Sequence, residues 1–258
     1  MINIASIQMK IGDEAKELNL KRASGLIDSV DGADLILLPE LWNIGYFAFA
    51  SYRDECEDLN GPTITLLKEK AARKGCYIFG GSLVIRSEDG GLYNTSTLIN
   101  PKGEIIAQYG KIHLFGYDSE EARLLRRGTE IRVVKSEIGT FGLSTCYDLR
   151  FPELYRKMAV MGAELFLVAS AWPYPRLEAW LMLNRVRALE NQTFLISSNC
   201  TGINRGKQFV GHSMIVDPWG TPMATGGDEE CILRAKIDLQ KVYEARKIFP
   251  AFNDRVFI

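Results

Sequence analysis

The sequence has few of the residues that mark disulfide-rich, metal-binding or membrane-spanning proteins. Its 258 residues include only five cysteines and two histidines, and no cysteine pair has the C-x-x-C spacing of zinc or redox sites. An odd, scattered set of cysteines argues against a disulfide framework. No apolar run approaches the roughly 18 residues of a membrane span, and no basic leader with a cleavage site is seen at the amino terminus. We therefore expect free thiols in a cytoplasmic protein.

Neither sign of charge is in excess. Lys and Arg total 31 against 32 Asp and Glu, which gives a net charge of -1. Nucleic-acid-binding proteins usually carry a basic excess, so a small-molecule substrate is the better expectation. Ligand spacing indicates no metal, and we expect no cofactor. No linker, repeat or low-complexity segment divides the chain, so a single domain over residues 1–258 is predicted.

Apolar runs that end at Gly, Pro or Asn predict many short strands, and stretches of helical period alternate with several of them. The Asn100–Gly103 turn predicts a hairpin, Thr63 is a candidate N-cap and Gly75 a candidate C-terminal cap. A mixed pair of sheets with helices outside is the most economical architecture. Strands are expected over residues 3–9, 35–38, 77–85, 96–100, 104–108, 131–135, 140–145, 165–169, 193–198, 213–217 and 231–237, and helices over 14–30, 63–74, 151–162 and 177–192.

A carboxylate ends the second predicted strand. The apolar run 35–38 leads directly into Pro39 and Glu40, and proline prevents a simple continuation of a central strand. Open α/β sheets bind their ligands at the carboxyl ends of strands. Glu40 is therefore a candidate site residue, although a solvated loop carboxylate is the plainer interpretation of this segment alone.

A lysine and a histidine follow the predicted hairpin, in the segment Tyr109-Gly-Lys-Ile-His113. The Lys111 ammonium is suited to lie beside a carboxylate or a developing oxyanion, while most lysines are simply solvated. With only His113 and His212 in the chain, a papain-like Cys–His dyad is arithmetically possible. A histidine between Ile and Leu is more often a hydrogen-bonded structural residue.

A cysteine lies where a hydrophobic strand turns towards a helix, in Thr145-Cys-Tyr-Asp-Leu-Arg150. This layout presents a nucleophile at the rim of a sheet, and backbone N–H groups there can stabilise a thiolate. A lone cysteine on an apolar strand is by default a small buried hydrophobe. The polar cluster of Asp148, Arg150 and Glu153 is not required by packing and favours Cys146 as a nucleophile.

Together and in this order, the three segments resemble the nitrilase superfamily, the carbon–nitrogen hydrolases. The resemblance covers essentially the whole chain, from the strand ending at Gln8 to the segments 211–220 and 249–255. It implies an α/β fold, an αββα sandwich of two mixed β-sheets with flanking helices. Carried over residue by residue, it implies that Glu40 is the general base, Lys111 the oxyanion stabiliser and Cys146 the nucleophile of an amidase.

The family often has a second glutamate before a Pro-Gly or similar turn. Glu121 lies seven residues before Gly128 and matches that spacing, with Glu120 as the alternative. Here Arg127 replaces the usual proline. The resemblance also implies that the backbone N–H of Tyr147 helps Lys111 to bind the oxyanion.

The loop 169–176 bears on the substrate because it follows a predicted strand. Trp172 and Tyr174 are suited to wall an acyl chain, and Arg176 to bind a distal carboxylate; the alternative is a surface Arg176 paired with Glu178. For Arg150 we expect a structural salt bridge with its acidic neighbours. This loop, the segment 185–191 and the turn 217–220 are similar to those of the omega-amidase-like branch. That similarity implies hydrolysis of 2-oxo dicarboxylic acid monoamides such as 2-oxoglutaramate.

Several alternatives stay open from the sequence. N-carbamoyl amino acids also present a carboxylate and are the close competitor as substrates. A catalytically silent interaction module, an acyltransferase and a Cys–His protease are the alternatives of other kinds. The apolar tail, about 249–258, is expected to pack on a partner in a homodimer.

Overall fold

The protein is described by a computed structural model over residues 1–117 and 119–257. The first sheet contains β1 (Ile2–Gln8), β2 (Leu35–Leu37), β3 (Tyr77–Arg86), β4 (Leu92–Ile99), β5 (Ile105–Gly110) and β14 (Cys231–Ile237), in the order β14-β1-β2-β3-β4-β5. The second contains β6 (Val133–Ser136), β7 (Gly139–Thr145), β8 (Leu165–Ser170), β9 (Phe194–Asn199), β12 (Met214–Val216) and β13 (Pro222–Thr225), in the order β13-β12-β9-β8-β7-β6. Each sheet has a parallel centre, β1-β2-β3 or β7-β8-β9, and antiparallel margins.

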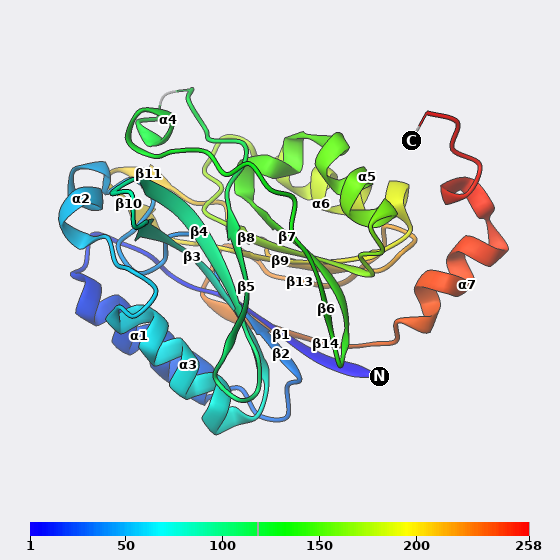
Figure 1. The fold of residues 1–258 in the computed structure, drawn as a ribbon, viewed down its shortest axis with the longest axis horizontal. Coiled ribbons are helices and arrows are strands. Elements are labelled where there is room, and N and C mark those ends of the chain that lie inside the picture. Colours follow the sequence, from blue (N-terminus) through cyan, green and yellow to red (C-terminus); the bar gives the residue numbers. More distant parts are fainter. Residues whose placement is uncertain (118, 258) are drawn as a thin grey trace.

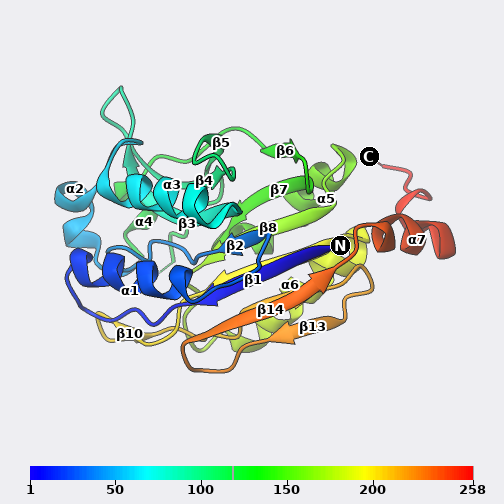
Figure 2. The ribbon, with the colours of Figure 1, turned by 90° about the horizontal axis from the view of Figure 1, so that it is seen from below.

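The helices lie outside the two sheets (Figures 1 and 2). Helices α1 (Lys16–Asp28) and α3 (Pro62–Lys74) cover the first sheet, and α5 (Pro152–Val160) and α6 (Leu177–Asn191) cover the second. The predicted αββα sandwich of two mixed sheets is therefore confirmed. The short elements are α2 (Tyr52–Glu55), α4 (Glu121–Leu124), the pair β10 (Ile203–Asn204) and β11 (Lys207–Gln208), and the 3-10 turns η1 (Phe49–Ser51), η2 (Cys146–Arg150) and η3 (Pro250–Phe252).

In the part of the chain that the structure describes, three apolar cores hold these layers together. The middle core lies between the sheets, where Leu37 and Phe79 of the first pack with Phe141 and Leu167 of the second. The other two cores lie between each sheet and its own helices. Burial on both faces explains why the central strands are continuous apolar runs rather than alternating ones.

The predicted strands and helices agree with the structure apart from their ends, and the predicted hairpin is formed by β4 and β5. Gly75 caps α3 in the left-handed conformation, as expected. The prediction that Thr63 is an N-cap is wrong, because α3 already begins at Pro62 and the Thr63 hydroxyl donates to Glu57. The elements α2, α4, α7 (Gln240–Ile248), β10, β11 and β13 were not predicted.

The carboxyl-terminal part leaves the sandwich through α7 (Figure 1). Phe252 of η3 is buried, with the guanidinium groups of Arg246 and Arg255 at 4.0 and 3.6 Å from its ring centroid. Phe249 and Phe257 are 60% and 98% exposed. Ile258, the last residue of the predicted tail, lies outside the described residues. Among those residues, no helix is both long and apolar enough to cross a membrane.

Candidate active site

Glu40 lies just beyond β2, on a turn that a glycine makes possible. Glu40 forms an isolated β-bridge with Ser82 of β3, and the Leu41 N–H donates to the Ser82 carbonyl at 2.8 Å. A Cβ on Gly81 would lie 1.9 Å from the Pro39 oxygen, so only glycine permits this approach. Leu41 has a φ of +45°, a costly conformation for leucine that the surrounding bonds maintain.

Cys146 occupies an equivalent position after β7. The strand ends at Thr145, Cys146 has a φ of +47°, and the chain then makes the 3-10 turn η2 before α5 begins at Pro152. The expected strand, nucleophile and helix are present in this order, with η2 between the cysteine and the helix. Both Glu40 and Cys146 therefore lie at carboxyl ends of central strands, one from each sheet.

Lys111 and Glu121 complete a buried cluster with Glu40. The Lys111 Nζ lies 2.8 Å from Glu40 Oε1 and 2.9 Å from both carboxylate oxygens of Glu121. All three side chains have no exposed surface. Glu120, the alternative second glutamate, points outwards and pairs with Arg123. The structure therefore brings Glu121, and not Glu120, to Lys111.

Neutral donors fix the two carboxylates. The Asn94 side-chain amide lies 2.8 Å from both Glu40 Oε1 and Glu121 Oε1. The N–H of Ala171 donates to Glu40 Oε2 at 2.9 Å, and the Tyr46 hydroxyl donates to Glu121 Oε2 at 3.2 Å. The sequence interpretation missed Asn94 and Tyr46, because neither an asparagine on a strand nor a tyrosine in an aromatic stretch is distinctive by itself.

Burial and mutual charge control the protonation of this cluster. Burial raises the pKa of the Glu40 carboxyl, Lys111 opposes that shift and Glu121 adds to it. Burial also raises the pKa of the Cys146 thiol, and the charge of Glu40 raises it further. Burial disfavours the ammonium of Lys111, but Glu121 and Glu40 outweigh this effect and raise its pKa well above the usual value. The arrangement keeps Lys111 charged and the thiol protonated until a base accepts its proton.

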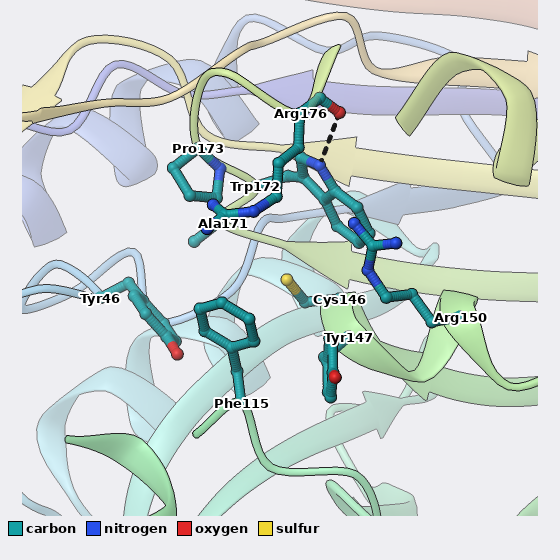
Figure 3. A pocket seen from close by; sticks show the side chains of 9 residues that line it. All are labelled: Tyr46, Phe115, Cys146, Tyr147, Arg150, Ala171, Trp172, Pro173 and Arg176. Atoms are coloured by element: carbon teal, nitrogen blue, oxygen red, sulfur yellow. Dashed lines mark hydrogen bonds between the residues drawn. The ribbon is translucent and has the colours of Figure 1, made fainter. Parts of the chain in front are cut away.

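A pocket opens above Cys146 (Figure 3). The sulfur points into the pocket between Phe115 and Trp172. The lining consists mainly of aromatic side chains and two arginines: Tyr46, Phe115, Cys146, Tyr147, Arg150, Ala171, Trp172, Pro173 and Arg176.

The predicted substrate-binding residues Tyr147, Trp172 and Arg176 all line this pocket. Arg176 lies over the Phe115 ring, 5.3 Å from its centroid, and forms no ion pair with Glu178 in the described part of the chain. The described lining does not include Tyr174, whose hydroxyl donates to Asp228 instead. Tyr174 is therefore not a wall of the pocket as predicted.

Arg150 differs from the prediction. It forms no ion pair with Asp148 or Glu153 among the residues that the structure describes; its guanidinium lies 5.0 Å from the Trp172 ring centroid, at the pocket rim. Asp148 turns inwards and is fully buried, so it is out of reach of the exposed arginine. The pocket thus has a guanidinium on each side of Trp172 (Figure 3).

Neither histidine lies beside the cysteine. His113 Nδ1 is 2.7 Å from Asp148 Oδ1, and His212 Nε2 is 3.2 Å from Asp228 Oδ1. Neither residue lines the pocket within the described ranges. The papain-like dyad considered from the sequence is therefore not formed. In the same part of the chain, no group of three or more His, Cys, Asp or Glu side chains is arranged to hold a metal ion.

Comparison with known proteins identifies the family. A model of the carbon–nitrogen hydrolase family matches residues 3–247. The chain belongs to the carbon–nitrogen hydrolase family. It is accordingly a hydrolase that acts on non-peptide C–N bonds, as the resemblance to the nitrilase superfamily implied.

Individual relatives of this carbon–nitrogen hydrolase span almost its whole length. Proteins named 2-oxoglutaramate amidase from Paenarthrobacter nicotinovorans and Bacillus subtilis are each 39% identical to it. The alignments cover 98% and 97% of this chain and 89% and 96% of those proteins. The crystal structure of XC1258 from Xanthomonas campestris, described as a CN-hydrolase superfamily protein, matches with a TM-score of 0.92 at 29% identity and covers 100% of this chain and 98% of its own.

Proposed function

We propose that this enzyme hydrolyses a small amide that bears a distant carboxylate, a 2-oxo dicarboxylic acid monoamide such as 2-oxoglutaramate, to the acid and ammonia. The observation that carries the proposal is a buried thiol beside a Glu–Lys–Glu cluster, under a small pocket rimmed by two guanidinium groups. The names of the two relatives at 39% identity support the same substrate class.

The first half of the reaction transfers the acyl group to the cysteine. In this proposal Glu40 accepts the thiol proton while the sulfur of Cys146 attacks the amide carbon, and Glu40 then gives a proton to the departing nitrogen. The raised pKa of Glu40 suits it to both steps, because a base that is too acidic would not take a proton from a thiol whose own pKa is raised. Ammonia leaves and a thioester remains.

The tetrahedral intermediate needs fixed donors for its oxyanion. We assign this role to the Lys111 ammonium and the backbone N–H of Tyr147. Glu121 contributes by holding Lys111 through two contacts of 2.9 Å, which orient the ammonium before substrate binds. Water activated by Glu40 then attacks the thioester and releases the carboxylic acid.

The acid end of the substrate is assigned to the rim. Arg176 supplies a planar, permanently charged fork that suits a carboxylate. Arg150, on the other side of Trp172, adds positive charge at the entrance. Aromatic walls between these groups and Cys146 fit a short acyl chain rather than a long one.

N-carbamoyl amino acids remain the second candidate, because they too place a carboxylate a few bonds from the carbonyl carbon. A silent interaction module is disfavoured because the reactive groups are all assembled and buried. We also propose a homodimer that uses the tail, about 249–258, because Phe249, Val256 and Phe257 are 60%, 85% and 98% exposed in one chain. The five free cysteines fit the cytoplasmic location that we propose.

A substrate panel tests the proposed reaction. Purified protein and the Cys146→Ala variant are incubated with 2-oxoglutaramate, succinamate, N-carbamoyl-β-alanine and a simple nitrile, and ammonia release is measured. We expect release from the oxo-acid amide that is absent in the variant. If ammonia is released from N-carbamoyl-β-alanine alone, the substrate is an N-carbamoyl amino acid and not an oxo-acid amide. Equal ammonia release by the Cys146→Ala variant would refute the mechanism.

A further inference from the structure

Asp148 is a buried carboxylate for which the proposed chemistry has no role. It lies in η2, two residues after the nucleophile, and has no exposed surface. It does not line the pocket, so it does not touch a substrate there. Packing alone does not call for a carboxylate at this depth, since a buried charge costs free energy unless its hydrogen bonds are satisfied.

Within the described ranges, four hydrogen bonds end on Asp148, and they come from two segments. Oδ2 accepts from the Thr145 N–H at 2.9 Å and from the Tyr109 hydroxyl at 2.7 Å. Oδ1 accepts from the His113 N–H at 3.1 Å and contacts His113 Nδ1 at 2.7 Å. Each oxygen thus has two partners, which uses the full acceptor capacity of a carboxylate.

The hydrogen-bond partners of Asp148 lie next to two residues of the active site. Tyr109 and His113 flank Lys111 along the chain, while Thr145 immediately precedes Cys146. The His113 ring also stacks on Phe151, with centroids 3.7 Å apart and an interplanar angle of 7°. One carboxylate therefore joins the segment that carries the oxyanion donor to the turn that carries the nucleophile.

We propose that Asp148 is a positioning residue that fixes Cys146 relative to Lys111, with His113 as its outer partner. The inference rests on the proposed function. Cys146 has a φ of +47°, a conformation that non-glycine residues leave unless the surroundings enforce it. The bond from the Thr145 N–H to Asp148 holds the Cys146 backbone in this conformation from the side of the strand. The bonds from Tyr109 and His113 to Asp148 fix the position of Cys146 relative to Lys111.

The test replaces Asp148 by asparagine. The side chain keeps its shape, but an NH2 group takes the place of one carboxylate oxygen and faces N–H or O–H donors with which it cannot form the same hydrogen bonds. Asp217→Asn is the matched control. Asp217 also caps a turn, through the N–H groups of Trp219 and Thr221, but in the described structure it has no bond to the segments that carry Lys111 and Cys146. We expect kcat to fall about 100-fold in Asp148→Asn, the cost of a displacement of roughly 1 Å, with KM within about threefold. Asp217→Asn should change neither.

Alkylation of Cys146 by iodoacetamide, followed by peptide mass spectrometry, gives a readout that needs no amide turnover. Its rate should fall in Asp148→Asn by about the same factor as kcat, beyond any loss of folded protein seen in thermal unfolding. If Asp148→Asn does not fold, His113→Phe keeps the stacked ring, removes one contact and should lower both rates about tenfold. Unchanged rates in the folded variant overturn the proposal. A slower alkylation without hydrolysis of any panel amide would support it and count against the proposed function instead.

Discussion

Replacing Glu121 by glutamine tests the assembled cluster more sharply than any other single change. Glu121 holds the Lys111 ammonium through two contacts of 2.9 Å and accepts further bonds from Asn94, Tyr46 and the Phe115 N–H. Glutamine keeps the shape but removes the charge and places an NH2 group among donors. Among the residues that the structure describes, Lys111 then retains only Glu40 as a carboxylate partner.

The expected magnitude follows from this geometry. Breaking a buried ion pair costs about 3–5 kcal/mol, and because Glu40 still neutralises Lys111 we expect the lower end, about 3 kcal/mol. For a chain of this size that corresponds to a fall of about 6–12 °C in Tm. Losing the orientation of an oxyanion donor lowers kcat by about 100-fold to 1000-fold. Removing the Glu121 charge also removes one cause of the raised pKa of Glu40, so the acid limb of the pH–rate profile should move to lower pH.

Glu120→Gln is the matched control. Its side chain is 45% exposed and pairs with Arg123 on the surface, so we expect a loss below about 1 kcal/mol and unchanged kinetics. Steady-state ammonia release against pH and thermal unfolding measure both variants. The reasoning is refuted if Glu121→Gln stays within about threefold of the parent enzyme in kcat, or if Glu120→Gln loses as much activity.

Four further predictions follow from the pocket, from Glu40 and from the tail. Arg176→Leu should raise KM for 2-oxoglutaramate by about 10-fold to 100-fold, because a charge-assisted pair is lost. The preference of the enzyme for 2-oxoglutaramate over the neutral butyramide should fall with it. If the ratio of kcat/KM for these two amides does not change, Arg176 is rejected as the carboxylate site. Because the pKa of Glu40 is raised, kcat/KM should rise with pH through values above the usual range of glutamate, roughly 4.3. Because the pKa of Glu40 is higher in the folded protein than in the unfolded chain, ionisation of Glu40 destabilises the fold. The free energy of unfolding should therefore decrease as pH rises through the raised pKa, and Glu40→Gln should not show this decrease. Truncation after Ile248 should give monomers in sedimentation, with the exposed Trp219→Ser as a control; a surviving dimer would contradict the tail interface.

The sequence predicted those features that depend on local pattern. Glu40, Lys111 and Cys146 each follow a strongly apolar or hairpin strand, so their placement at strand ends could be predicted before their contacts were known. Glu121 was implied only by the resemblance to the nitrilase superfamily, through the family's spacing before Gly128. The structure distinguishes it from Glu120 by burial, which the sequence does not encode locally.

Features that depend on contacts between distant segments were beyond local pattern. Asn94 was missed because its partners Glu40 and Glu121 lie 54 and 27 residues away. The expectation for Arg150 was wrong because adjacency suggested a pair with Asp148, whereas the tight turn η2 directs the aspartate into the core and the arginine to the rim. Side-chain direction on a turn of this kind is decided by tertiary hydrogen bonds, here those from Tyr109 and His113.

Direct detection of the thioester tests the central claim. The enzyme is mixed with excess 2-oxoglutaramate, quenched in acid within the first turnovers and examined by intact-protein and peptide mass spectrometry, with Cys146→Ala in parallel. The account predicts an added 2-oxoglutaryl group on the peptide that contains Cys146, absent from the variant, and diversion of the product to a hydroxamate when hydroxylamine is present. Full-rate ammonia release with neither an adduct nor a hydroxamate, or an adduct on Cys200 instead, would contradict it.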